Sequence, residues 1–331
     1  MAGRRTNLAL LAFFALALAT GALAYSIGAG WVRAVLIAHG VAGLALVALA
    51  PWKSVIARRG IRRRGPRSLP SVILSVLVGV AIVFGVLHAT GAAVSLGPMT
   101  AMQVHVAAAL VAIPFALWHV AARRIRVRRT DFSRRALLKA GAVTGGSAIA
   151  YGLLEVLPIR GRDRRFTGSY MAGSFRPDAM PVTQWLNDRV PTIDPSTWRL
   201  SVIAGDSRRS WTYDELTAFD DRLRAVIDCT GGWYSEQEWS GVLLSRLVPD
   251  PVPGRSIEVA SFTGYGRRFP AGDAGRLLLA TRVGGRPLAP GHGFPARVVA
   301  PGRRGFWWVK WVSAIRTSDT PWWWQLPFPI T

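Results

Sequence analysis

The only cysteine of the chain stands in the stretch IDCTGGW, at residues 227–233 of 331. Residues 224–228 before it are typical of a short strand, and the glycines after it are typical of a turn that lets backbone approach another group closely. We therefore predict that the Cys229 thiol stands at a strand end beside a glycine-lined space. An unpaired cysteine can bridge to another molecule, lie inert in a core or bind a metal or reacting group, and the stretch alone leaves these alternatives open.

The composition indicates a membrane part joined to a soluble part, because half of the residues are apolar in a chain too long for one domain. The formal net charge of +23 would by itself suggest nucleic acid. Residues 1–159 contribute +16 of it and residues 160–331 only +7. Most of the excess therefore flanks apolar segments, where membrane orientation explains it, and we expect no nucleic-acid partner.

Five apolar runs are long enough to cross about 30 Å of hydrocarbon. They occupy residues 8–27, 32–50, 69–93, 100–122 and 136–158, the last being rich in Gly and Ala. Basic residues gather before the first run, at 53–67 and at 123–139, so the positive-inside rule places these segments in the cytoplasm.

The sequence therefore predicts an N-terminal all-α bundle of five transmembrane helices, with the lipid bilayer of a bacterial cell as a partner. The expected domains are a four-helix transmembrane domain at 1–125, a segment with the fifth, anchoring helix at 126–159, and a domain on the extracytoplasmic side at 160–331.

The segment SRRALLK, at residues 133–139, resembles the twin-arginine export signal, with Leu137 where that signal usually has Phe. The alternative is that Arg134 and Arg135 only set the topology. The flanking Ser and Leu-Lys favour export, a route that carries folded domains, so the outer domain is expected to acquire a cofactor in the cytoplasm. The following helix has only a weak cleavage site and is expected to stay as an anchor.

Four of the five histidines lie in the apolar runs, where ionisable side chains are costly and commonly functional. They are His39, His88, His105 and His119. His105 and His119 share one helix face about 21 Å apart. Depth places His119 near the cytoplasmic end and the other three near the outer side. We therefore predict one outer haem b held by His105 and either His88 or His39, a pattern that resembles membrane cytochromes. The alternative is that these histidines form hydrogen bonds between helices or lie near the headgroups.

Residues 160–331 contain strand-length apolar runs and many turn residues. Strands are predicted near residues 198–202, 224–228, 256–262, 277–282, 297–302 and 307–312. A short helix is predicted to begin at Thr212, which can form a capping box with Glu215, and a second helix is predicted at 238–244. Short strands with irregular helices indicate an α+β domain with a substantial β core.

The order of five motifs resembles the molybdopterin domain of the sulfite oxidase family over about residues 165–320. The motifs are WRLSV at 198–202, DC at 228–229, WSGV at 239–242, GHGFPARVVAPG at 291–302 and VKWV at 309–312. The resemblance implies a molybdenum–molybdopterin cofactor whose metal is bound by the Cys229 thiolate, and a soft thiolate suits such a metal.

The resemblance also implies which side chains bind the pterin. Arg297 and Lys310 match the cations that hold the pterin phosphate, which fits their charge. The other implied contacts are Tyr170, Thr263, His292 and Trp308. Taken singly, Arg297 could instead face solvent, Lys310 could cover aromatic surface with its stem, and His292 could be a turn residue.

Two departures from the family leave the substrate open. The basic and tyrosine cluster used by sulfite-oxidising members is not recognisable. Gly231 stands where the branch that repairs methionine sulfoxide has an acidic residue, two positions after the metal cysteine.

The sequence thus predicts a membrane-anchored molybdenum oxidoreductase that catalyses two-electron oxygen-atom transfer on a small molecule. Electrons are expected to pass through haem b to or from a membrane quinone. One alternative keeps the enzyme but makes the membrane half an inert anchor with a separate electron-transfer partner. Another is a non-catalytic binding protein that kept the fold.

Overall fold

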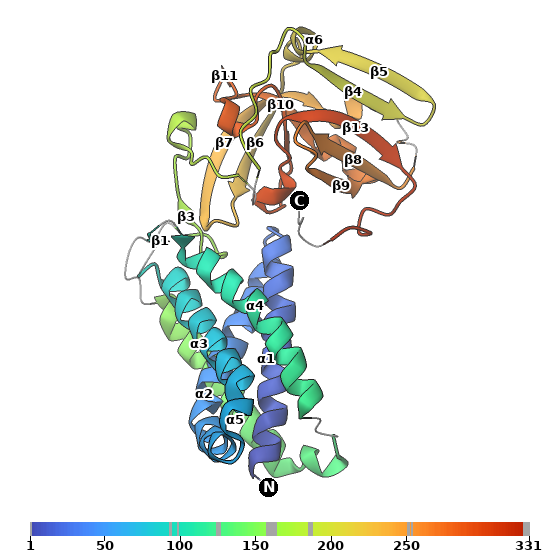
Figure 1. Ribbon diagram of the computed structural model, residues 1–331. Coiled ribbons are helices and arrows are strands. Elements are labelled where there is room, and N and C mark those ends of the chain that lie inside the picture. Colours follow the sequence, from blue (N-terminus) through green and yellow to red (C-terminus); the bar gives the residue numbers. More distant parts are fainter. Residues whose placement is uncertain are drawn as a thin grey trace. The chain divides into compact units, whose positions relative to one another are not determined.

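The computed structural model describes residues 2–92, 95–97, 99–123, 127–156, 164–184, 188–249, 252 and 254–326 (Figure 1). It divides into two compact units. The first comprises Met1–Tyr25 and Gly30–Tyr170, and the second comprises Ser26–Ala29 and Met171–Thr331. The predicted domain boundaries near residues 125 and 159 lie outside the described residues.

Within the described residues, the first unit has five long helices, each apolar enough to cross a membrane by length and composition. They are α1 (Ala2–Ser26), α2 (Val32–Arg64), α3 (Leu69–Thr90), α4 (Ala101–Ala122) and α5 (Arg134–Val156). The prediction of five such helices is confirmed. Helix α3 packs along α4 and α2 packs along α5, while apolar side chains such as Leu117, Ile149 and Leu153 are exposed on the outside.

Local signals explain where these helices begin and end. Thr100 caps α4 by accepting a hydrogen bond from the Gln103 backbone, and the Gln103 side chain accepts one from the Thr100 backbone. Helix α3 has a proline in its first turn and ends at Gly91, which adopts a left-handed conformation with φ of 72°. The short elements of this unit are η1 (Gly65–Ser68), β1 (Ser95–Leu96), β2 (Met99–Thr100) and η2 (Arg129–Phe132).

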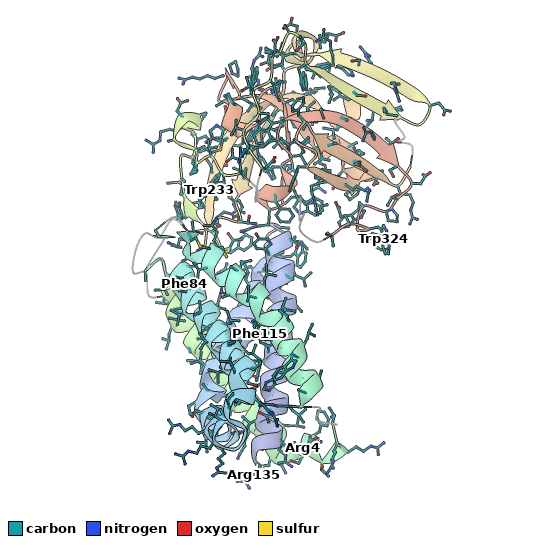
Figure 2. The ribbon with its side chains drawn as sticks, viewed as in Figure 1. Arg4, Phe84, Phe115, Arg135, Trp233 and Trp324 are labelled. Carbon is teal, nitrogen blue, oxygen red and sulfur yellow. The ribbon has the colours of Figure 1, made fainter. Side chains whose placement is uncertain are left out.

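Basic residues gather at one end of the helical unit. Arg4 of α1 and Arg135 of α5 lie at the same end (Figure 2). Arg4 forms an ion pair of 3.0 Å with Asp131, just before α5. Lys53 of α2 donates a hydrogen bond of 2.8 Å to Asn7 of α1. The charge segregation predicted from the sequence is therefore also a segregation in space.

The described part of the second unit is built on two mainly antiparallel sheets (Figure 1). One has the order β11-β10-β7-β3, with β6 paired to β7 and β12 to β10. The other has the order β5-β4-β13-β8-β9, in which only the β4–β13 pair is parallel. The predicted α+β fold with a β core is confirmed.

The strands of the first sheet are β3 (Tyr170–Met171), β6 (Asp221–Asp228), β7 (Trp233–Leu243), β10 (Leu278–Val283), β11 (Arg286–Pro287) and β12 (Arg297–Val299). Those of the second are β4 (Arg199–Ala204), β5 (Ser207–Thr212), β8 (Ser256–Ser261), β9 (Gly266–Pro270) and β13 (Val312–Ser318). The helical elements are α6 (Tyr213–Thr217), η3 (Pro177–Ala179), η4 (Leu244–Arg246), η5 (Ala271–Arg276), η6 (Pro290–His292) and η7 (Gly305–Trp307).

The predicted helix at residues 238–244 is wrong, because residues 238–243 belong to β7 and Leu244 begins η4. Strand β7 pairs antiparallel with both β6 and β10. Its buried face alternates through Trp233, Ser235, Gln237 and Trp239. Ser235 and Gln237 are fully buried although they are polar, so the period of two that marks a strand is not visible as an apolar alternation.

The predicted strand at residues 307–312 is also wrong over most of its length. The chain forms η7 up to Trp307, and β13 begins only at Val312. Trp311 has a positive φ of 51°, which is incompatible with a continuous strand. Trp307, Trp308 and Trp311 are all buried, so the apolar run reflects a buried loop.

Candidate active site

Cys229 stands directly after β6, at the start of the turn to β7, as the sequence predicts. Its backbone N–H donates a hydrogen bond of 2.8 Å to the Trp233 carbonyl, and its carbonyl accepts one of 3.0 Å from Gly232. The Gly231 N–H donates to Cys229 Sγ across 3.3 Å. The turn therefore directs one backbone donor at the sulfur, an arrangement that stabilises a thiolate.

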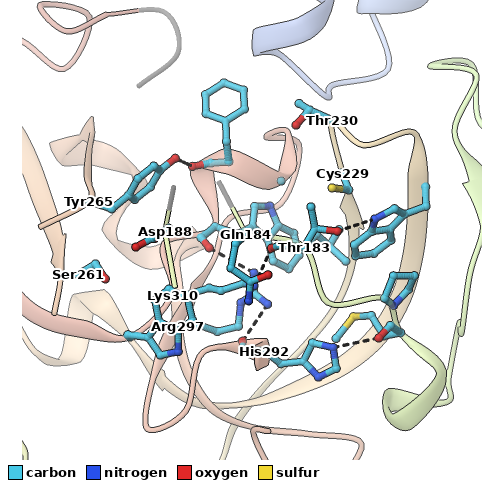
Figure 3. A pocket seen from close by; sticks show the side chains of 18 residues that line it. Thr183, Gln184, Asp188, Cys229, Thr230, Ser261, Tyr265, His292, Arg297 and Lys310 are labelled. Atoms are coloured by element: carbon cyan, nitrogen blue, oxygen red, sulfur yellow. Dashed lines mark hydrogen bonds between the residues drawn. The ribbon is translucent and has the colours of Figure 1, made fainter. Parts of the chain in front are cut away.

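The thiol opens into a cavity of about 690 Å³ that includes an open mouth (Figure 3). Five of the predicted site residues line it, namely Cys229, His292, Arg297, Trp308 and Lys310. The fold thus brings together side chains from the end of β6, from η6 and β12, and from the loop before β13.

Two cations lie beside this cavity, of which Arg297 is buried and Lys310 is half-buried. Arg297 is 1% exposed, and its guanidinium donates hydrogen bonds to the carbonyls of His292 and Trp308, 3.0 and 3.2 Å away. The Arg297 Nε is buried without a hydrogen-bond partner among the described residues. Lys310 Nζ donates to the carbonyls of Thr183 and Gly291, at 2.9 and 2.6 Å.

No ion pair within the described residues neutralises these cations, although Asp188 also lines the cavity and its negative charge acts on Lys310. Burial lowers the pKa of Arg297 to about 9. Burial, followed by repulsion from Arg297, lowers the pKa of Lys310 to about 7. Uncompensated buried charge is costly, so the cavity favours an anionic group such as a phosphate.

His292 is fixed beside the same cations. Its Nε2 donates a hydrogen bond of 3.0 Å to the Met180 carbonyl, which defines the proton position on that nitrogen. Burial, together with repulsion from Arg297, lowers the pKa of His292. A neutral, oriented imidazole at the cavity wall can accept or donate a hydrogen bond without adding a third charge.

A glycine permits the close spacing of the two cations. Gly293 has a φ of +107°, and a Cβ added there would lie 3.0 Å from the Arg297 Cβ and 3.1 Å from the Lys310 Cβ. Both the conformation and the space therefore require glycine.

Sequence reasoning missed a buried ion pair next to the cysteine. Arg304 Nη1 lies 3.0 Å from Asp228 Oδ1, and Arg304 Nη2 donates a hydrogen bond of 3.2 Å to the Cys229 carbonyl. The sequence did contain one signal for this pair, because Asp228 stands at the end of an apolar strand and a buried carboxylate needs a cation. Arg304 itself follows a basic residue in a turn, so its burial has no sequence signature.

Burial raises the pKa of the Cys229 thiol, while the Gly231 N–H and Arg304 act in the opposite direction. The thiol of the metal-free chain is therefore protonated at neutral pH, and a bound metal ion would be needed to hold it as a thiolate. The residues fit a molybdopterin cofactor on two counts. A soft sulfur ligand faces the cavity, and the buried Arg297 and half-buried Lys310 there form no ion pair with a carboxylate of the described residues.

Two other implied pterin contacts do not line this cavity. Thr263 is exposed in the turn after β8, and its hydroxyl is 3.0 Å from that of Ser261. Ser261 and Tyr265 line the cavity instead, on either side of it in sequence. Tyr170 lies in β3, where the two units divide.

The four histidines of the apolar runs belong to the helical unit and fall into different surroundings. His39 of α2 and His105 of α4 face each other, with ring centroids 5.8 Å apart. The His88 ring is 3.4 Å from the Thr167 carbonyl. His119 Nδ1 lies 3.0 Å from the Ser71 hydroxyl of α3.

Comparison with known proteins supports the cofactor assignment. The family described as the oxidoreductase molybdopterin binding domain matches residues 187–324. The mitochondrial sulfite oxidase of Drosophila melanogaster is 28% identical over 165 residues, covering 39% of this chain and 29% of that protein. The catalytic subunit of a protein-methionine-sulfoxide reductase from Burkholderia mallei is 27% identical over 156 residues, covering 40% of this chain and 46% of that protein. The solved structure of a sulfane dehydrogenase from Paracoccus pantotrophus covers 40% of each chain at 25% identity, with a TM-score of 0.37.

The chain spans less than half the length of these two curated relatives. The matched family region includes Cys229, His292, Arg297 and Lys310, the four residues whose geometry at the cavity fits the cofactor. The second unit therefore carries an oxidoreductase molybdopterin binding domain of the sulfite oxidase type.

Proposed function

We propose that the chain is a membrane-anchored molybdenum oxidoreductase that transfers an oxygen atom to or from a small molecule outside the cytoplasm. The observation that carries the proposal is the cavity in which the Cys229 thiol stands near the buried Arg297 and the half-buried Lys310, neither of which forms an ion pair with a carboxylate of the described residues. A cavity with this donor set needs both a soft metal and an anion. Molybdopterin provides them together.

The bound cofactor supplies two-electron redox chemistry and the transferable oxygen. Cys229 holds the metal through its sulfur, whose negative charge the Gly231 N–H stabilises. Arg297 and Lys310 hold the phosphate, and His292 lies against the cofactor as a neutral hydrogen-bonding group. Trp233 is fixed by the hydrogen bond of 3.1 Å from its Nε1 to the Thr183 hydroxyl, and it forms an apolar wall near the sulfur.

The distribution of charge in the helical unit supports the extracytoplasmic location. Arg4, Lys53 and the segment that starts α5 lie at one end of that unit, which the positive-inside rule assigns to the cytoplasm. Helix α5 begins at this basic end with the export-like segment at residues 133–139 and runs to Val156. The chain therefore leaves the last helix at the opposite, outer end.

Electrons reach or leave the active site one at a time through haem b and a membrane quinone. This part of the proposal is supported by the histidines within the apolar helices, because an inert anchor has no need of ionisable side chains at that depth. The competing arrangement uses the helices as an anchor only and a separate electron-transfer partner. Spectra of the reduced protein distinguish the two arrangements.

Two measurements on detergent-purified full chain test the molybdenum function. The wild-type protein should contain about one molybdenum per chain. It should also oxidise sulfite with ferricyanide or reduce methionine sulfoxide with reduced viologen, the substrate types named by its relatives. Cys229→Ser should lose turnover, whereas Ser207→Ala, at the exposed start of β5, should retain it. Wild-type protein without molybdenum, or a Cys229→Ser variant that still turns over, would falsify the proposal.

A further inference from the structure

We propose that His39 of α2 and His105 of α4 are the two axial ligands of one haem b in the helical unit. The inference rests on the electron-transfer part of the proposed function and goes further by naming the ligand pair. The sequence alone left the partner of His105 open between His88 and His39.

The distance between the two imidazoles is the distance that a shared metal requires. Their ring centroids are 5.8 Å apart and their planes are nearly perpendicular, at 89°. Metal–imidazole bonds are about 2.0–2.1 Å long, as for zinc, so two imidazoles on one ion have centroids roughly 6 Å apart. The two helices thus already hold the rings at the spacing of a two-histidine metal site.

Both rings are oriented in the same way by backbone carbonyls. His39 Nδ1 donates a hydrogen bond of 2.9 Å to the Ala17 carbonyl of α1, and His105 Nδ1 donates one of 2.6 Å to the Ala81 carbonyl of α3. A carbonyl can only accept, so the proton is on Nδ1 in each ring and the lone pair is on Nε2. Histidines that bind metals are typically oriented by such a hydrogen bond from the other nitrogen.

Glycines make room for each ring. A Cβ added at Gly21 of α1 would lie 3.0 Å from the His39 ring, and one added at Gly85 of α3 would lie 2.9 Å from the His105 ring. Gly43 lies one turn after His39 on α2, and an added Cβ there would meet no atom within 4 Å. The position one turn after His39 is therefore uncrowded, whereas a Cβ added at Gly40 would clash with the Tyr151 ring.

The donor set favours haem over a bare metal ion. Among the residues that the structure describes, no group of three or more His, Cys, Asp or Glu side chains could hold a metal. A bare ion between two imidazoles would lack ligands, because structural and catalytic metal sites use at least three protein ligands. Haem brings its own four nitrogens and needs only axial ligands from the protein.

The other two histidines have different environments. His88 Nε2 is 3.4 Å from the Thr167 carbonyl, and a Cβ added at Gly168 would lie 2.7 Å from the same nitrogen. The atom that would bind iron therefore already packs against backbone. His119 faces the Ser71 hydroxyl and lies 14 residues after His105, about 21 Å along α4.

The test uses the full chain purified in detergent, with molybdenum and haem measured on the same sample. The dithionite-reduced minus oxidised spectrum should show b-type Soret and α bands at about one haem per chain, and the ferric form should give a low-spin signal in electron paramagnetic resonance. His39→Ala and His105→Ala should each lower haem content at least about tenfold, or leave five-coordinate haem that binds carbon monoxide. Added imidazole should restore the low-spin signal in such a five-coordinate variant.

Three further variants sharpen the assignment. His105→Met keeps an iron ligand, so it should retain haem with an altered spectrum and a raised midpoint potential. His88→Ala and His119→Ala should keep the six-coordinate, low-spin signal of the wild type. If His88→Ala or His119→Ala loses the low-spin signal while His39→Ala keeps this signal, the assigned ligand pair is wrong.

The haem proposal and the molybdenum function can each be refuted without refuting the other. Wild-type protein with about one molybdenum per chain but without b-type bands would refute the haem site and leave the oxidoreductase intact. Wild-type protein with haem but without molybdenum would refute the oxidoreductase and leave the ligand pair standing.

Discussion

Arg304 and Asp228 form an ion pair of 3.0 Å in which both side chains are almost completely buried. Asp228 directly precedes the cysteine, and Arg304 also donates a hydrogen bond to the Cys229 carbonyl. The guanidinium thus ties the end of β6 to the loop before η7. We infer that this pair fixes the backbone from which the Cys229 sulfur projects.

Replacing Arg304 with Met should lower the free energy of unfolding by about 3–5 kcal/mol, because Asp228 would remain buried without its cation. Arg286→Met is the matched control. Its partner Asp178 is 2.8 Å away, but both side chains are mostly exposed, so the expected loss is about 0–1 kcal/mol. Denaturant unfolding of the detergent-solubilised chain, followed by tryptophan fluorescence, measures both. Equal losses in the two variants would show that the buried pair does not hold the loop.

Gly293→Ala should empty the active site of its cofactor. The added methyl group would meet the Cβ atoms of Arg297 and Lys310 at 3.0 and 3.1 Å and displace the two cations. Gly302→Ala is the control, since Gly302 also has a positive φ, +74°, but faces open space. Both substitutions strain the backbone, by about 1–2 kcal/mol in the left-handed region, and Gly293→Ala adds the crowding of the two cations. Molybdenum per purified chain should fall in Gly293→Ala and stay near the wild-type value in Gly302→Ala.

Thr212→Ala should destabilise the second unit by about 0.5–2 kcal/mol, because the Thr212 hydroxyl caps α6. Thr217 lies in the last turn of α6, and its hydroxyl donates to the Asp214 carbonyl without capping the helix. Thr217→Ala should therefore change the unfolding free energy by less than about 0.5 kcal/mol. The same denaturant titration provides the comparison, and molybdenum content should be unchanged in both variants.

Secondary structure was predicted best where a sequence pattern is compatible with a single structure. The long apolar runs could only be helices of membrane-spanning length, and Thr212 with Glu215 matched a capping box that the structure contains. Prediction failed at β7, where the buried polar residues Ser235 and Gln237 interrupt the apolar alternation. It failed again at Trp307, where an apolar run serves a buried loop.

The site residues that stand in short, contiguous sequence motifs could be predicted. Cys229, His292, Arg297 and Lys310 stand in short segments with recognisable order, and the fold brings all four to one cavity. Thr183 and Tyr265 also line it, but no local pattern marks them. Their place depends on how distant loops pack, which a single sequence does not encode locally.

Cofactor uptake should weaken as pH rises above neutrality. Burial lowers the pKa of Lys310 to about 7 in the cofactor-free chain, so above pH 7 binding of an anionic phosphate must be accompanied by uptake of a proton. The affinity should therefore fall by up to about tenfold per pH unit between about pH 7 and 9. Below pH 7 the lysine is charged in both states and the dependence should flatten.

The lowered pKa of Lys310 has the opposite effect on the stability of the cofactor-free chain, which should increase with pH. Between about pH 7 and the ordinary lysine value of 10.5, the unfolded chain keeps a proton that the folded chain has lost. The free energy of unfolding should therefore rise with pH in this window.

Loading of isolated cofactor into full chain made in cofactor-deficient cells, between pH 6 and 9, measures the first effect. Lys310→Arg is the control, because a guanidinium stays charged through more of this range, and its loading should depend on pH less steeply. A wild-type profile as flat as that of Lys310→Arg would show that Lys310 does not lose its proton in this pH range.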